Sequence, residues 1–186
     1  MPASEPLPST AASQPACAIR EIDPASTAEI EHVARGMRQT LIEVEGEETG
    51  TALYTLEWLQ QRVRWHLDPA TCTGKVFLAG NGERRIVGYT IVRVESGEDG
   101  RRHGQIATTY VAPASRRHAV ATALLARGED WFAALGLPEA ATWTSSTNDK
   151  LINLYRKHGY AISAEHIHEV TKTRMVRLAK TLAAKP

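Results

Sequence analysis

The sequence predicts a single α/β domain built on a mixed β-sheet with helices on both faces, and three observations support that prediction. The chain has 186 residues, of which 42% are hydrophobic and 23% charged, a size and composition typical of one hydrophobic core. A hairpin pattern over residues 75–94 predicts antiparallel strands. A strand–helix–strand pattern over residues 104–144 predicts a parallel pair, so the sheet must be mixed.

The composition narrows the class of function. A net charge of +1 gives no broad reason to expect nucleic-acid binding, which depends on neutralising many phosphates. The chain has no apolar run long enough to cross a membrane and no secretory signal, so we expect a cytoplasmic protein without a membrane partner. Cys17 and Cys72 are the only cysteines, and their spacing favours ordinary thiols over disulfides or a zinc site, so we expect no metal.

The first third of the chain is predicted to form a disordered arm followed by two helices. Residues 1–17 are rich in Pro, Ala, Ser and Thr and are predicted to form a disordered arm, which leaves residues 18–186 as the domain. A first helix is predicted from Asp23-Pro24 to about residue 45, because apolar residues recur at intervals of three and four. The same spacing predicts a second helix over residues 53–67.

The middle of the chain changes to extended periodicity. Residues 75–79 and 85–94 are rich in β-branched side chains and flank the turn sequence Gly80-Asn81-Gly82, which predicts a β-hairpin. A third strand is predicted over residues 104–111, with Ile106, Thr108 and Tyr110 on one face.

A βαβ unit follows the hairpin. Residues 116–135 carry two apolar stripes and predict a largely buried helix. Residues 141–144 predict a fourth strand, parallel to the third because a long helix separates the two. A short helix is expected over residues 148–157, and residues 160–170 and 173–179 predict the last two strands.

The junction between the third strand and its helix combines a strand end, a proline and two arginines, Arg116 and Arg117. The first N–H groups of a helix lack intrahelical partners and the helix dipole adds positive charge, so this junction can bind a phosphate. Taken alone, it also fits solvated arginines at an ordinary helix start. A nicotinamide dinucleotide is disfavoured because residues 116–121 lack the glycines of that fingerprint.

Two motifs resemble those of the GCN5-related N-acetyltransferase (GNAT) family. The family loop V-x-P-x-x-R-G-x-G-x-G/A is matched by Val111, Pro113, Arg116 and Ala121. The motif N-x-x-A-x-x-L-Y-x-K-x-G-F/Y is matched by Asn148, Leu154, Tyr155, Lys157, Gly159 and Tyr160. The resemblance covers roughly residues 19–180 in element order, and it implies a single GNAT-like domain whose sheet opens into a V-shaped splay between two parallel strands.

The resemblance also implies where acetyl-coenzyme A binds. The expected cofactor-binding residues are Tyr110, Val111, Arg116, Arg117, His118, Ala119, Val120, Ala121, Thr122 and Asn148. Ala119 and Arg117 stand where the family commonly has glycine. A positive φ at Ala119 would cost about 1 to 2 kcal/mol, whereas an ordinary helical φ would avoid that cost.

In reaction terms, the resemblance implies an N-acetyltransferase in which a primary amine of a small molecule or peptide attacks the thioester directly. The amide of Tyr110 or Val111 would stabilise the oxyanion, and Tyr155, a phenol with a pKa of about 10, would protonate the departing thiolate. The third-strand glutamate common in the family is replaced by Gln105, which cannot accept a proton. The acidic residues Glu43, Glu45 and Glu47 are therefore candidates for attracting the amine or relaying its proton.

Several alternatives stay open. The acidic residues also fit a solvated loop. Gln105 and Ala119 also fit a catalytically weak or inactive acyl-CoA-binding regulatory domain. His166 and His168 are two positions apart in a predicted strand, but no metal site is predicted from them. A homodimer is also possible. A nucleic-acid-binding module using Arg116, Arg117 and the basic residues 172–177 is disfavoured by the near-neutral charge.

Overall fold

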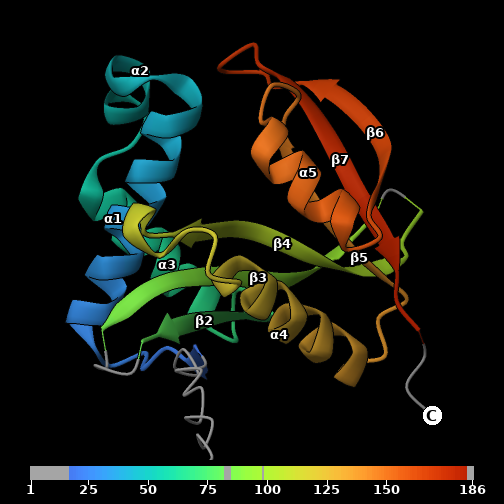
Figure 1. Ribbon diagram of the computed structural model, residues 1–186, viewed down its shortest axis with the longest axis horizontal. Coiled ribbons are helices and arrows are strands. Elements are labelled where there is room, and N and C mark those ends of the chain that lie inside the picture. Colours follow the sequence, from blue (N-terminus) through green and yellow to red (C-terminus); the bar gives the residue numbers. More distant parts are fainter. Residues whose placement is uncertain (1–16, 82–84, 98, 184–186) are drawn as a thin grey trace, which may run out of the picture.

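The structure, a computed structural model, describes residues 17–81, 85–97 and 99–183, so the predicted arm lies outside it except for Cys17. Seven strands form one mixed sheet in the order β1-β2-β3-β4-β5-β7-β6 (Figure 1). The elements are β1 (Ala18–Glu21), α1 (Thr27–Glu45), α2 (Glu47–Ala52), α3 (Leu56–Leu67), β2 (Gly74–Gly80), β3 (Ile86–Ser96), β4 (Arg102–Val111), the 3₁₀ turn η1 (Pro113–Ser115), α4 (Val120–Ala134), β5 (Glu139–Ser145), α5 (Asp149–Lys157), β6 (Ala161–Ile167) and β7 (Arg174–Thr181). The predicted fold class is confirmed.

Helices cover both faces of the sheet (Figure 1). On one face, α1 and α3 bury Val33 and Val63 against β2 and β3. On the other face, α4 and α5 bury Leu124, Phe132 and Ile152. Each such side chain contributes about 1.5 to 3 kcal/mol when fully buried, so the two clusters hold the helices in fixed positions on the sheet.

The parallel strands β4 and β5 separate before either strand ends. They pair only from Gly104 opposite Ala140 to Ile106 opposite Thr142, although β4 continues to Val111 and β5 to Ser145. The backbone groups beyond these pairs no longer meet across the two strands. The expected V-shaped splay is confirmed, and it opens toward the carboxyl ends of both strands.

A β-bulge changes the direction of side chains along β4. The register between β3 and β4 shifts by one residue at Ala107. Ile106 therefore packs in the cluster beneath α4, whereas Tyr110 packs in the cluster beneath α1. The prediction that Ile106, Thr108 and Tyr110 share one face is wrong, because an extra residue interrupts the alternation of side chains.

Two helices near the N-terminus begin later than predicted. The hydroxyl of Ser26 accepts from the amide of Glu29 at 3.3 Å, so α1 starts at Thr27 and not at Asp23-Pro24. The hydroxyl of Thr55 likewise caps α3. Between the two lies the short helix α2, which the apolar spacing did not reveal. Hydroxyl caps satisfy free helix amides and so fix where a helix begins.

Three further features concern the residues that the structure describes. None of their helices has the length and apolar character needed to cross a membrane. Cys17 and Cys72 are both free thiols. In the same residues, His, Cys, Asp and Glu side chains do not gather in any group of three or more that could hold a metal ion.

Candidate active site

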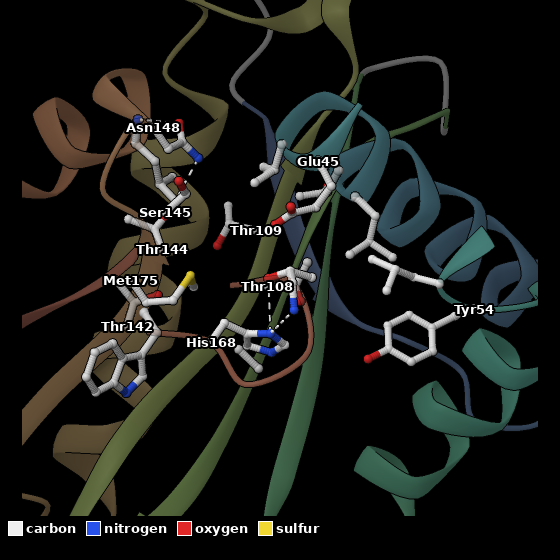
Figure 2. Close-up of a pocket in the computed structure, with 18 of the residues that line it drawn as sticks. Glu45, Tyr54, Thr108, Thr109, Thr142, Thr144, Ser145, Asn148, His168 and Met175 are labelled. Atoms are coloured by element: carbon white, nitrogen blue, oxygen red, sulfur yellow. Dashed lines mark hydrogen bonds between the residues drawn. The ribbon is translucent and has the colours of Figure 1, made fainter. Parts of the chain in front are cut away.

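A cavity of about 250 Å³ lies where β4 and β5 diverge. Figure 2 shows residues of α1 and the α2–α3 segment on one side and residues of β5 and α5 on the other, with β4 between them. The labelled lining residues are Glu45, Tyr54, Thr108, Thr109, Thr142, Thr144, Ser145, Asn148, His168 and Met175. Its polar lining consists largely of hydroxyl groups, and it links the two faces of the sheet through the splay.

In the loop between β4 and α4, two residues that are not glycine adopt the left-handed backbone conformation. Arg117 has φ 66° and Ala119 has φ 59°, so α4 begins at Val120 and not at residue 116 as predicted. Each left-handed non-glycine residue costs about 1 to 2 kcal/mol. Ala119 offers no side-chain cap, so the first amides of α4 are left for another hydrogen-bond acceptor.

Arg116 is tied to neighbouring protein groups. Its Nε donates to the carbonyl oxygen of Val111 at 3.0 Å, and its Nη2 lies 2.7 Å from Oε1 of Glu43. The two side chains of this ion pair are 37% and 39% exposed, and pairs of that kind contribute about 0 to 1 kcal/mol. Arg116 therefore connects the loop before α4 to the last turns of α1.

The three predicted acidic residues occupy different environments. Glu43 pairs with Arg116 and does not line the cavity. Glu47 is exposed at the start of α2 and does not line it either. Glu45 does line the cavity, where its carboxylate accepts from the hydroxyl of Thr173 at 3.1 and 3.3 Å. Of the three, only Glu45 can meet a ligand inside the cavity.

Tyr155 lies on the opposite side of the cavity from Glu45. It is 2% exposed and lines the cavity from α5. Burial raises the pKa of its phenol to about 12, although hydrogen bonds with Thr109 and Thr142 act in the opposite direction. Tyr155 therefore stays protonated at neutral pH and can donate a hydrogen bond into the cavity.

The free edge of β4 presents one of the two predicted oxyanion donors. The amide of Ala112 donates to the carbonyl of Val87 in β3 at 2.8 Å. Successive amides of a strand alternate between its edges, so Tyr110, which lies opposite Tyr89, also points its amide toward β3. The amide of Val111 points toward the gap left by β5. Of the two predicted donors, this geometry favours Val111, because β3 occupies the edge toward which the Tyr110 amide points.

The remaining predicted cofactor residues lie around α4 and α5. Asn148 lines the cavity and caps α5, accepting from the amide of Leu151 at 3.3 Å. His118 is exposed. The side chain of Val120 is buried in the core, so only its backbone faces the loop, and Thr122 contacts a ring nitrogen of His158 at 3.2 Å.

No residue on β4 can serve as a base in the cavity. Gln105 is 4% exposed, donates to the carbonyl of Ile106 at 3.3 Å and does not line the cavity. From the bulge onward, the residues of β4 that line the cavity are Ala107, Thr108 and Thr109, and none of them ionises near neutral pH. A proton must therefore leave the cavity through other groups or water.

His168 and Tyr54 also line the cavity, and neither was assigned a role from the sequence. Nδ1 of His168 accepts from the amide of Thr171 at 3.2 Å, so in the neutral ring the proton resides on Nε2. Tyr54 stacks on Trp58 with ring centroids 4.1 Å apart. Both residues lie in loops that only the tertiary fold brings to β4, so local patterns in the sequence could not identify them.

Thr142 and Thr144 were also missed, although the sequence carried a signal for them. They alternate with apolar residues in β5, and both are buried, at 3% and 5% exposure. Buried hydroxyls need hydrogen-bond partners. Thr142 donates to the carbonyl of Ile106 at 2.9 Å, and Thr144 accepts from the side-chain amide of Asn148 at 3.2 Å.

Comparisons with known proteins agree with this geometry. Residues 30–160 match the model of the Acetyltransferase (GNAT) family. Over 111 residues the chain is 25% identical to mycothiol acetyltransferase from Acidimicrobium ferrooxidans, a match that covers 60% of this chain and 34% of that protein. The chain thus spans about a third of the length of this relative.

Solved structures with low sequence identity share the fold. The NatC complex bound to Gag peptide and CoA matches with a TM-score of 0.72 at 16% identity, over 90% of this chain and 99% of that chain. Aminoglycoside 6'-acetyltransferase type Ii matches with a TM-score of 0.68 at 18% identity, over 91% and 99%. Ard1 from Thermoplasma volcanium matches with a TM-score of 0.66 at 18% identity, over 90% and 99%.

Proposed function

Because the chain belongs to the GNAT family of acetyltransferases, we propose that it transfers the acetyl group of acetyl-coenzyme A to a primary amine of a small molecule or peptide. The observation that carries this proposal is the cavity at the splay. It has a buried phenol, Tyr155, on the side of α5 and a carboxylate, Glu45, on the side of α1. Thioester and amine would enter from these two sides and meet beside β4.

The loop before α4 would hold the diphosphate of the cofactor. Arg117 and Ala119 have left-handed φ values, which would let neighbouring amides face one side, and such arrangements bind anions. The uncapped first turn of α4 adds further donors and the positive end of the helix dipole. Arg116 would act indirectly, because Val111 and Glu43 already occupy its guanidinium.

The pantetheine arm would then follow the free edge of β4 to the cavity. There a neutral amine would attack the thioester carbon, and a backbone amide on the free edge of β4 would stabilise the oxyanion that forms. Val111 points its amide to this edge, although Val111 does not line the cavity itself. When the intermediate collapses, the C–S bond breaks and the thiolate leaves. The proton lost by the amine passes to water, with Glu45 in the same cavity as a relay.

Tyr155 would stabilise the thiolate mainly by donating a hydrogen bond. Its pKa of about 12 lies roughly 3.5 units above that of an ordinary thiol, so full proton transfer would be uphill by about 5 kcal/mol. A hydrogen bond needs no such transfer and strengthens as charge develops on sulfur. Solvent protonates the thiolate after release.

The experiment is a thiol-release assay with acetyl-coenzyme A and a panel of amines, with the product identified by mass. We expect Tyr155→Phe to lower kcat about 100-fold, as for the loss of one donor to a developing charge, and to leave cofactor affinity unchanged. The matched control is Tyr160→Phe, because Tyr160 donates to Glu129 at 2.9 Å and does not line the cavity. Wild-type turnover by Tyr155→Phe would refute this role.

A regulatory domain that binds acyl-CoA without turnover is the second candidate. It is motivated by the lack of a base on β4, where Gln105 stays out of the cavity. Cofactor binding with no thiol release from any amine in the panel would favour this candidate over acetyl transfer.

A further inference from the structure

We infer that the acceptor is an amine with one positive charge on an apolar body, and that Glu45 binds its ammonium group. The inference rests on the proposed acetyl transfer and narrows the acceptor class. It excludes polycations such as polyamines and aminoglycosides as preferred acceptors. An amphiphilic small amine and a peptide with an apolar N-terminal sequence share the required chemistry.

The charge of the cavity supports a single cationic centre. Among the lining residues that the structure describes, Glu45 is the only carboxylate, and neither lysine nor arginine lines the cavity. Glu43 pairs with Arg116, whereas Glu45 accepts from the hydroxyl of Thr173 and forms no ion pair with another of the described residues. Glu45 is also the last residue of α1, where the helix dipole adds partial negative charge. Inside the cavity, a second ammonium of the same acceptor would find no other carboxylate among the described lining residues.

The mouth of the cavity carries exposed apolar side chains, beside the exposed carboxylate of Glu169 in the turn between β6 and β7. Of the exposed large hydrophobic side chains in the described residues, Val44, Trp58 and Val170 are 37%, 42% and 70% exposed. Val44 lines the cavity, and Trp58 stacks on Tyr54, which lines it. Val170 lies in the turn between β6 and β7, between His168 and Thr171, which both line the cavity. Exposed apolar groups gathered around a site mark a ligand surface.

The cavity has room for the amine group of the acceptor but not for the rest of the molecule. A volume of about 250 Å³ must hold both the acetyl thioester and the attacking amine. The rest of the acceptor must therefore lie at the mouth, against the side chains described above. The hydrogen bond between Thr173 and Glu45 fixes the β6–β7 turn beside α1, and Figure 1 shows this turn and α2 at the same end of the molecule. The β6–β7 turn and the α1–α2 segment thus form the two walls of the mouth.

The test is calorimetric titration of the full chain with amines, in the presence and absence of CoA, so that binding is measured without turnover. The probes are phenethylamine, an Ala-Leu-Leu peptide amide, spermine, neomycin and methylamine. We expect phenethylamine or the peptide to bind more tightly than both polycations. Whichever of phenethylamine and the peptide binds more tightly shows whether the acceptor is a small amine or a peptide. Acetyl-coenzyme A is titrated separately. If it fails to bind, the proposed function falls, and amine binding to the free chain still decides the acceptor class.

Two variants sharpen the test. Glu45→Gln should weaken the preferred amine about tenfold, the typical effect of losing a hydrogen bond to a charged group, while Glu47→Gln, the same change outside the cavity, should have no effect. Val170→Ser should weaken phenethylamine or the peptide and leave methylamine unchanged. Tighter binding of spermine or neomycin, or equal binding by wild type and Glu45→Gln, would overturn the inference.

Discussion

Ala119→Gly tests the left-handed loop before α4. At φ 59° the alanine methyl costs about 1 to 2 kcal/mol, which glycine avoids. Glycine also has more freedom in the unfolded chain, which costs about 0.4 to 1 kcal/mol. The difference predicts that Ala119→Gly raises the free energy of unfolding by about 0.5 to 1 kcal/mol, or Tm by roughly 1 to 4 °C.

The matched control is Ala126→Gly, because Ala126 is exposed within α4. Glycine in an exposed helix interior should lower the free energy of unfolding by about 1 kcal/mol. Urea denaturation of both variants and the wild type measures the two effects. The same substitution should thus act in opposite directions seven residues apart in the chain. Destabilisation by Ala119→Gly equal to that of Ala126→Gly would refute the left-handed conformation and the anion loop built on it.

Three further predictions concern stability. Tyr155 has a folded pKa of about 12 against about 10 unfolded, so both states are protonated below pH 10 and only the unfolded state loses its proton above it. The free energy of unfolding should therefore fall by about 1.4 kcal/mol per pH unit between pH 10 and the folded pKa of about 12, and urea titrations of Tyr155→Phe should lack this component. Gly104→Ala would place a Cβ 2.3 Å from the ring of Phe132, so denaturation should show a loss of about 1 to 3 kcal/mol; an unchanged midpoint would contradict this packing. A double-mutant cycle of Arg116→Gln and Glu43→Gln should give a coupling energy below about 1 kcal/mol, and a value above about 2 would show that the pair is more desolvated than its exposure indicates.

The fold was predictable where local chemistry determines it. Gly80-Asn81 marked the turn of the hairpin, and the long helix between β4 and β5 required them to be parallel. Asn148 and Gly159 marked the two ends of α5, and Gly159 indeed has φ 86°. Each of these residues acts through its own backbone or its nearest neighbours, so the sequence contains the necessary information.

The bulge and the start of α4 depend on the tertiary fold. Side-chain alternation continues in the sequence through Ala107, and only pairing with β3 shows that it is an extra residue. Arg117 and Ala119 are ordinary helix formers, and their left-handed φ values are set by the path from β4 to α4. Local propensity could not reveal either feature.

The candidate site was predictable in part. The motif identified Tyr155 and Asn148, and both line the cavity. Sequence reasoning could not rank Glu43, Glu45 and Glu47, because the partner of Glu43, Arg116, lies 73 positions away in the chain. The bond between Glu45 and Thr173 spans 128 positions. Ion pairs and hydrogen bonds over such separations exist only in the folded chain.

The central claim is that acetyl-coenzyme A binds along the loop before α4 and enters the splay between β4 and β5. Amide chemical-shift mapping by NMR during titration with acetyl-coenzyme A tests it most directly. The account predicts saturable shifts that are largest at Val111, at residues 117–122 and at Asn148, with small shifts on β1 and β2. No shifts, or shifts centred away from this loop, would contradict it.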